Sequence, residues 1–258
     1  MNKPTFLGHA RPLRVAMLHT AEPSLCISRV RTALYDGADA FGLQICQMPV
    51  ELRTDENYRK ILRPMGDKPL YVTNYRSQHS ASHTDEERAE EMMHALRCGA
   101  TLLDVMGDQF DPSPLQMTYN PEAVEKQKAL IGRIHEAGGE VIMSSHTGCF
   151  QPPEKVLEIA LAQKERGADI AKIVTNAASD EEMMQNLEAI TLMKRELGIP
   201  FLFLANGSHY KMQRMIGPML GCCMWLCVVE YTSSCTPTQP LLCAVSRVME
   251  NFDYIPER

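Results

Sequence analysis

The sequence lacks both an excess of basic residues and a long apolar run. It has 26 Lys and Arg against 32 Asp and Glu, giving a net charge of −6 and a pI near 5.8. Nucleic acids and anionic membrane surfaces bind proteins through basic faces. A membrane helix needs about 18 or more apolar residues in sequence, whereas the longest run here, 222–230, has the length of a strand. We therefore expect neither a nucleic-acid partner nor a membrane partner.

The late cysteines also lack the C-x-x-C spacing of a metal site. Nine cysteines are present, an odd number, and five of them fall after residue 221. They are expected to pack as small apolar side chains, and no metal or organic cofactor is expected. The first residues, MNKPTFLGHARPLR, have no apolar signal-peptide region. Free thiols without a signal sequence indicate a cytoplasmic protein.

The 258 residues contain eight short apolar runs that alternate with longer amphipathic ones. Near-continuous apolar runs are typical of parallel strands buried on both faces. The predicted strands are Arg14–Leu18, Ala40–Cys46, Leu70–Asn74, Thr101–Val105, Glu140–Ser144, Asp169–Val174, Phe201–Leu204 and Met224–Val229. The predicted helices are Ser24–Asp36, Thr84–Arg97, Pro121–Ala137, Pro152–Arg166, Ser179–Leu197, Tyr210–Ile216 and Pro240–Glu250. Alternation of this kind, at close to the usual length of about 250 residues, predicts an α/β protein of the (β/α)₈ TIM barrel class.

Local signals support the helix boundaries and the domain organisation. Thr84 precedes Glu87 by three residues, which predicts a capping box. Gly138, Gly167 and Gly198 follow predicted helix ends, where a left-handed residue is favoured. We see no linker or repeat, so residues 1–258 are predicted to form one barrel domain, with 1–13 as a tail or a cap on the barrel.

Two long polar loops follow predicted strands. They are Tyr75–His83 after the third strand and Tyr231–Gln239 after the eighth. Barrel enzymes keep their active sites at the C-terminal ends of the strands. The active site is therefore expected between these loops.

Lys172 lies within an apolar strand, in the segment A-D-I-A-K-I-V. Such a lysine either pairs with a carboxylate inside the barrel or acts as a nucleophilic amine, since burial lowers its pKa. His146 ends the preceding strand, and adjacent strands lie about 5 Å apart. An amine and an imidazole at one barrel mouth would supply a Schiff base and proton transfer.

Two arginines follow predicted strands and could bind a substrate carboxylate. Arg76 follows the third strand and Arg214 the seventh. The guanidinium group binds carboxylates through two hydrogen bonds. The alternative is that either one is simply an exposed arginine at a helix start.

These residues, in this order, resemble the type I 3-dehydroquinate dehydratase family over most of the chain. The segment I-M-S-S-H resembles the family's histidine motif and places its proton-transfer histidine at His146. G-A-D-I-A-K-I resembles its Schiff-base motif and places the lysine at Lys172. The resemblance implies that Arg214 binds the substrate carboxylate. The segment 235–239, C-T-P-T-Q, resembles the family's last active-site loop, which places Cys235 and Gln239 in the site. Tyr75-Arg76-Ser77 resembles another family segment.

The sequence departs from the family at the positions that contact the substrate hydroxyl groups. A glutamate and an arginine on the second strand correspond here to Gly42 and Gln44, and a glutamate that holds the histidine corresponds to Ser80. The family serine of the last loop corresponds to Cys235. Because Gly42 has no side chain, the pocket is expected to be larger and less polar on that side.

The resemblance implies a lyase that eliminates water from a cyclic polyhydroxy keto acid through a lysine Schiff base. In the family this reaction converts 3-dehydroquinate to 3-dehydroshikimate, in the shikimate pathway or in quinate catabolism. Lys172 and His146 would be catalytic, and Arg76, Arg214, Gln239, Gln44 and Cys235 would bind substrate. The alternatives are a related lyase or aldolase on another keto acid, and a non-catalytic ligand-binding barrel. A homodimer is also expected.

Overall fold

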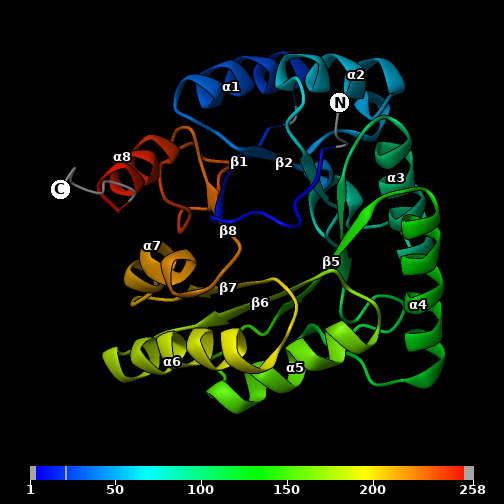
Figure 1. Cartoon of the computed structure of the whole chain (residues 1–258). Helices are drawn as coiled ribbons and strands as arrows, with labels where there is room; N and C mark the ends of the chain where they lie inside the picture. Colours follow the sequence, from blue (N-terminus) through cyan, green and yellow to red (C-terminus); the bar gives the residue numbers. More distant parts are fainter. Residues whose placement is uncertain (1–3, 21, 253–258) are drawn as a thin grey trace.

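Eight parallel strands form the centre of the molecule and eight α-helices surround them (Figure 1). A computed structural model of the chain describes residues 4–20 and 22–252. The strands are β1 Leu13–Leu18, β2 Ala40–Gln44, β3 Leu70–Thr73, β4 Leu102–Met106, β5 Glu140–His146, β6 Ile170–Asn176, β7 Phe201–Asn206 and β8 Met224–Cys227. The helices are α1 Pro23–Tyr35, α2 Asp55–Leu62, α3 Asp85–Arg97, α4 Pro121–Glu136, α5 Pro153–Glu165, α6 Asp180–Glu196, α7 Lys211–Leu220 and α8 Leu242–Phe252.

The sheet curls into a nearly closed barrel. Hydrogen-bonded neighbours run in the order β7-β6-β5-β4-β3-β2-β1-β8. The two end strands approach each other where the Cys223 N–H donates to the Phe201 carbonyl at 2.8 Å. The predicted (β/α)₈ barrel is confirmed.

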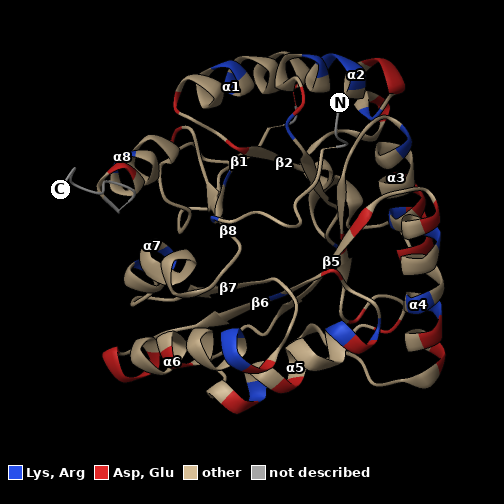
Figure 2. Ribbon diagram, in the orientation of Figure 1, with Lys and Arg blue, Asp and Glu red and all other residues tan. Residues whose placement is uncertain are grey.

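The core has an inner and an outer layer, as the apolar strands predicted. Val15, Leu102, Ile142 and Leu202 belong to the cluster inside the barrel. Larger clusters fill the space between strands and helices. Charged residues lie mainly on the outer helices (Figure 2). No helix in the described ranges is both long enough and apolar enough to span a membrane.

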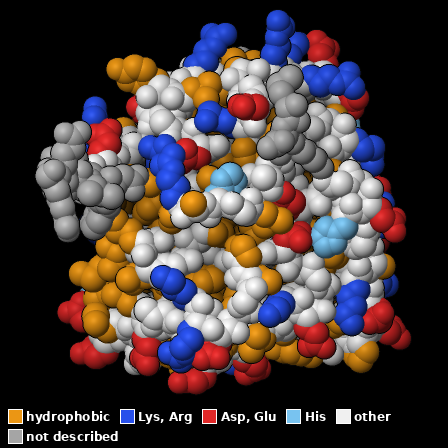
Figure 3. Space-filling view, viewed as in Figure 1, with side chains coloured by type: hydrophobic (Ala, Val, Ile, Leu, Met, Phe, Trp, Pro, Cys, Tyr) orange, Lys and Arg blue, Asp and Glu red, His pale blue; other side chains and the backbone are white. Residues whose placement is uncertain are grey.

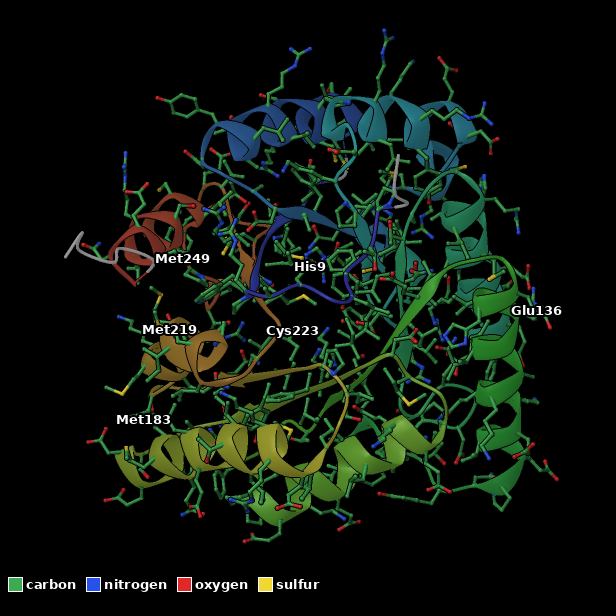
Figure 4. The ribbon with its side chains drawn as sticks, in the orientation of Figure 1. His9, Glu136, Met183, Met219, Cys223 and Met249 are labelled. Carbon is green, nitrogen blue, oxygen red and sulfur yellow. The ribbon has the colours of Figure 1, made fainter. Side chains whose placement is uncertain are left out.

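The segment before β1 lies across the N-terminal ends of the strands. Phe6 is buried, its N–H donates to Glu140 Oε2 at 2.9 Å, and its ring meets that of Tyr71 edge-on. Atoms fill the centre of the ring of helices on this side (Figure 3), where the labelled residues His9 and Cys223 also lie (Figure 4). The route into the barrel is therefore at the opposite, C-terminal ends of the strands.

The predicted helix boundaries are largely correct, with one helix missed. The capping box of Thr84 and Glu87 forms, and Gly138, Gly167 and Gly198 all have positive φ. Helix α2 was not predicted, because its eight residues carry only two buried apolar side chains, Tyr58 and Ile61.

Several strand ends differ from the predictions. The fifth, sixth and seventh strands extend to His146, Asn176 and Asn206, whose polar side chains do not continue the apolar runs. The second strand stops at Gln44, because Ile45–Gln47 turns into a 3₁₀-helix. The strand predictions therefore ended too early where polar residues follow the apolar run, and these polar strand ends face the barrel mouth.

Candidate active site

The Lys172 side chain points into the barrel at the floor of a cavity of about 240 Å³. Only 3% of the residue is exposed. Its Nζ donates to the hydroxyl groups of Tyr71 at 2.9 Å and Tyr75 at 2.6 Å, and to Asp104 Oδ2 at 3.0 Å. The cavity walls come from all sides of the mouth and are formed by Met17, Gln44, Tyr71, Thr73, Tyr75, His146, Lys172, Val174, Leu204, Asn206, Arg214, Leu226, Thr236 and Gln239.

One possibility predicted from the sequence was that Lys172 pairs with a carboxylate inside the barrel. Asp104 on β4 is this carboxylate. It is fully buried and accepts hydrogen bonds from Ser144 Oγ and from the hydroxyl groups of Tyr71 and Tyr75. Burial alone would raise the pKa of Asp104, but the Lys172 ammonium and these donors outweigh it and lower the pKa. A carboxylate stabilised in this way stays ionised, and protonating it would require free energy.

Burial lowers the pKa of Lys172 from its usual value, and Arg214 contributes in the same direction. Asp104 opposes both effects. The ion pair and the lowered pKa of Lys172 are compatible. Asp104 stabilises the ammonium form, and burial reduces the free-energy cost of converting it to the neutral amine. A neutral amine is the form that attacks a carbonyl carbon.

His146 is held by Gln116, which lies in the 3₁₀-helix Pro114–Gln116 after β4. The His146 backbone N–H donates to Gln116 Oε1 at 2.9 Å, and Nδ1 lies 2.6 Å from the same atom. Because a backbone N–H can only donate, this amide atom is an oxygen, and Nδ1 must carry the ring proton. Nε2 is therefore the basic nitrogen of the neutral imidazole.

Burial, followed by the charge of Lys172, lowers the pKa of His146 to about 3. The ring also meets the Tyr75 ring edge-on, with centroids 5.1 Å apart. The imidazole is thus fixed in orientation and neutral at physiological pH. This is the state that a general base requires.

The partner of His146 does not come from the loop that family resemblance indicated. Ser80, at the position of the family glutamate, is buried and donates to Asn74 Oδ1 at 2.7 Å. Gln116 replaces it from a different loop, with φ of 49°, beside Leu115 with φ of 61°. Such values are uncommon and costly for residues other than glycine. An amide holds the imidazole without adding charge.

Arg214 on α7 is a buried cation with no carboxylate partner among the residues that the structure describes. Its Nε donates to the Ala205 carbonyl at 2.7 Å and its Nη2 to Asn206 Oδ1 at 2.8 Å. It is 5% exposed, and burial lowers its pKa to about 10. A buried charge without a counter-ion is costly, so an anion bound beside Arg214 would be stabilised.

Arg76 was predicted to bind substrate, but it does not line the cavity. Its Nε and Nη2 donate to the Asp85 carboxylate at 3.1 and 2.7 Å, and its Nη1 to Asp108 Oδ1 at 2.8 Å. Two carboxylates thus satisfy its charge and donors. They join the loop after β3 to the start of α3 and the loop after β4.

The other predicted binding residues divide into two groups. Gln44 and Gln239 line the cavity, and the buried Gln239 Oε1 has no hydrogen-bond partner among the described residues. Cys235 does not line it, because its Sγ turns back to accept from the Thr232 N–H at 3.4 Å. Thr236 lines the cavity in its place.

The expectation of a larger pocket beside Gly42 is wrong. A Cβ atom on Gly42 would lie 2.2 Å from Met17 Sδ and 2.8 Å from Met17 Cε. Met17 on β1 therefore already fills the space beside Gly42. The pocket is apolar on this side, as expected, but it is not enlarged.

Sequence reasoning missed Asp104, Tyr71, Tyr75 and Gln116. Asp104 had a usable signal, because it is the one charged residue in the strand L-L-D-V-M. The two tyrosines resemble core aromatic residues, and Gln116 lies in an irregular loop. Their relevance depends on contacts across several strands.

The chain is similar in sequence to known 3-dehydroquinate dehydratases. The profile of the family described as "Type I 3-dehydroquinase" matches residues 38–250. The 3-dehydroquinate dehydratase of Alkaliphilus oremlandii is 26% identical over 172 residues, which cover 66% of this chain and 64% of that protein. That of Lactiplantibacillus plantarum is 28% identical over 137 residues, 52% of each chain. The chain thus spans only 64% and 52% of the length of these relatives.

The fold comparison agrees with the sequence comparison. The crystal structure of 3-dehydroquinate dehydratase from Geobacillus kaustophilus superposes with a TM-score of 0.76. The match is 18% identical and covers 96% of this chain and 94% of that one. At 18% sequence identity, the superposition supports a shared fold and nothing beyond it.

Proposed function

Because this chain belongs to the type I 3-dehydroquinase family, we propose that it is a hydro-lyase acting on a cyclic keto acid through a Schiff base on Lys172. The substrate of first choice is 3-dehydroquinate. One observation carries the proposal: Lys172 Nζ lies at the floor of a cavity whose walls include His146 and the unpaired cation Arg214.

The first step is attack of the Lys172 amine on the substrate ketone. The ammonium first gives up a proton to solvent water, which burial favours because it lowers the pKa of Lys172. The C–N bond forms as the carbonyl π bond breaks, and the amine proton passes to the former carbonyl oxygen to give a carbinolamine. The carbinolamine takes up one proton from solvent and loses its hydroxyl group as water, while the Asp104 carboxylate at 3.0 Å from Nζ stabilises the positive nitrogen. The resulting iminium acidifies the neighbouring C–H bond, which explains why no metal is needed for this step.

The second step belongs to His146. Its Nε2 takes a proton from the carbon next to the iminium, leaving an enamine. The enamine expels the β-hydroxyl group, which leaves as water with the proton from His146. Water then hydrolyses the iminium and releases Lys172 as a free amine. The base ends the cycle in the neutral state in which it began.

Arg214 and Gln239 are the proposed carboxylate ligands. The guanidinium supplies the positive charge, and both residues border the cavity from the β7 and β8 side. Gln44 is the proposed hydroxyl contact on the opposite side. Arg76 and Cys235 are left out of the binding set, and Arg76 instead positions the loops around the mouth through Asp85 and Asp108.

A related lyase or aldolase on a less hydroxylated keto acid is the second candidate. Met17 favours it, because an apolar side chain occupies the space beside the position of the family glutamate. Loss of a hydrogen-bonding partner changes substrate discrimination by up to about 10⁴–10⁵-fold. A non-catalytic barrel is disfavoured, because the buried amine, base and cation have no structural reason to share one cavity.

Borohydride trapping tests the proposal. The protein would be mixed with 3-dehydroquinate, reduced, digested and analysed by mass spectrometry, with product formation followed in parallel. We expect an irreversible adduct on Lys172 that Lys172→Ala abolishes. Lys164→Ala is the control, since Lys164 is an exposed lysine on α5 whose Nζ donates to the Leu197 carbonyl at 2.7 Å, away from the cavity. An adduct on another lysine would contradict the assignment. An adduct that forms with other keto acids but not with 3-dehydroquinate would favour the second candidate.

The proposal extends to the state of the protein in the cell. We infer a cytoplasmic homodimer made of one barrel domain per chain, from residue 1 to 258, with no nucleic-acid partner. The net charge of −6 supports the last point, and exposed Met184 on α6 and Met212 on α7 offer an apolar contact face. Sedimentation velocity would show a species of twice the chain mass, and a monomer at all concentrations would contradict the dimer.

A further inference from the structure

Three metal-ligating side chains meet on the outer helix layer, away from the cavity. His94 and Cys98 lie four residues apart at the end of α3, so that they share one helix face. Asp55 is the first residue of the neighbouring α2 (Figure 1). One oxygen of Asp55, Nε2 of His94 and Sγ of Cys98 all lie within 4.8 Å of one another. None of the three lines the central cavity.

The distances are close to those of a tetrahedral zinc site. With Zn–N and Zn–O bonds of about 2.0–2.2 Å and Zn–S of about 2.3 Å, ligand atoms would stand about 3.3 Å apart for N and O and about 3.6 Å for S and O. Cys98 Sγ already lies 3.5 Å from Asp55 Oδ1. His94 Nε2 lies 2.5 Å from the same oxygen and would need to move away by about 0.8 Å. The exposed Asp55 side chain can rotate to allow this.

Neighbouring residues hold two of the ligands in place. The Tyr58 ring meets the His94 ring edge-on, with centroids 5.4 Å apart. Arg59 Nη2 contacts the other carboxylate oxygen, Asp55 Oδ2, at 2.9 Å. Groups of this kind orient ligands in known metal sites, although the arginine also subtracts from the negative charge. The Oδ1 atom remains available for a cation.

We propose that Asp55, His94 and Cys98 form a binding site for a divalent transition metal ion of the zinc class. The mixed O, N and S donors suit zinc better than magnesium or calcium, which prefer oxygen ligands. Metal binding replaces the proton on the Cys98 thiol and the proton shared by His94 and Asp55. Asp55 and His94 are partly open to solvent, so water completes the coordination. The ion fastens the start of α2 to the end of α3.

Titration with cobalt(II) tests the site in the full chain. Cobalt reports thiolate ligation through a charge-transfer absorption band and tetrahedral geometry through intense d–d bands. We expect one equivalent to bind with both signals, and zinc to displace it. Cys98→Ser removes the charge-transfer band and weakens affinity by at least about tenfold, equivalent to about 1.4 kcal/mol.

Cys243→Ser is the matched control, because Cys243 is an exposed cysteine on α8 far from the cluster in sequence. It is expected to leave both signals unchanged. Asp55→Asn, at an exposed position, keeps the thiolate but weakens binding, and circular dichroism checks that each variant is folded. Absence of a thiolate band in the unmodified protein, or its loss in Cys243→Ser instead of Cys98→Ser, would overturn the proposal. Borohydride trapping on Lys172 is independent of either result.

Discussion

The two sides of the barrel mouth differ in how they are built. On the β4–β6 side, Lys172 Nζ pairs with Asp104 and the His146 ring is held by Gln116, so that each of these polar groups has a partner. On the β1–β2 side, Met17 packs against Gly42, and Gln44 is the polar side chain that faces the cavity. Under the proposed function, the first side would supply the amine and the base, and the second would select the substrate. Chemistry and specificity are therefore separable here by mutation.

Lys172→Ala should have the largest effect, with loss of all measurable turnover. The variant removes the proposed Schiff-base nitrogen, and among the described residues no second lysine lines the cavity. The alanine also leaves Asp104 without its cation, so that thermal denaturation must confirm folding. Lys172→Met, which keeps most of the side-chain volume, is the companion variant. His146 and the other groups of the site remain in this variant, and general acid–base catalysis supplies about 10²–10⁴-fold by itself. Turnover above about a thousandth of the original rate in a folded variant would therefore contradict an essential role for Lys172.

His146→Ala should slow turnover by about 10²–10⁴-fold, the usual contribution of a general acid–base group. The amine remains, so the borohydride-trapped adduct should still form and should accumulate before proton transfer. Mass spectrometry after short incubation measures the trapped fraction. An unreactive Lys172 in this variant would show that His146 assists Schiff-base formation itself.

Arg214→Ala should lower kcat/KM by the cost of one charge-assisted hydrogen bond, about 1.5–3 kcal/mol. The loss should be smaller for an analogue in which the carboxylate is replaced by a neutral amide. Arg133→Ala is the control, because Arg133 is an exposed arginine on α4 that pairs with Glu90 on α3 and does not line the cavity. An equal loss for both substrates would mean that Arg214 does not bind the carboxylate.

Gln116→Glu should change the pH profile more than the maximal rate. In the unmodified protein the His146 pKa is about 3, so the imidazole stays neutral at any higher pH. A carboxylate at Nδ1 favours the protonated ring and raises this pKa. The base is then lost at a higher pH, and the acidic limb of kcat/KM should move upward by at least about one pH unit, or about 1.4 kcal/mol. Gln116→Met, which removes the hydrogen bond without adding charge, should lower the rate and leave the limb in place.

The sequence predicted that Lys172 and His146 on the β4–β6 side would lie at one barrel mouth, and both line the same cavity, but it did not predict the packing on the β1–β2 side. Lys172 and His146 stand out because a polar residue in an apolar run is a local signal. The pairing of Arg76 with two carboxylates was not predicted, because an arginine after a strand looks the same in sequence whether it meets substrate or carboxylates. Met17 was overlooked because its role depends on the absence of a side chain at Gly42, on another strand. Contacts between strands, which set these roles, have no local pattern.

The smallest expected effect concerns substrate choice. Gly42→Glu with Gln44→Arg restores the family's hydroxyl-contacting pair in sequence, but the new Cβ at position 42 would meet Met17 Sδ at 2.2 Å. We therefore expect the double variant to gain nothing, and its combination with Met17→Ala to raise kcat/KM on 3-dehydroquinate by about tenfold, equivalent to about 1.4 kcal/mol of transition-state binding. Met17→Ala alone is the control, because it opens the space without supplying a hydrogen-bonding group. If the triple variant is no better than this control, the second strand does not select the substrate. If the unmodified protein already turns over 3-dehydroquinate with a kcat/KM of about 10⁴–10⁸ M⁻¹s⁻¹, other residues, with Gln47 or His19 as candidates, have taken over the hydroxyl contacts. His19 would then be the first to replace, since both of its ring nitrogens are buried without a hydrogen-bond partner among the described residues.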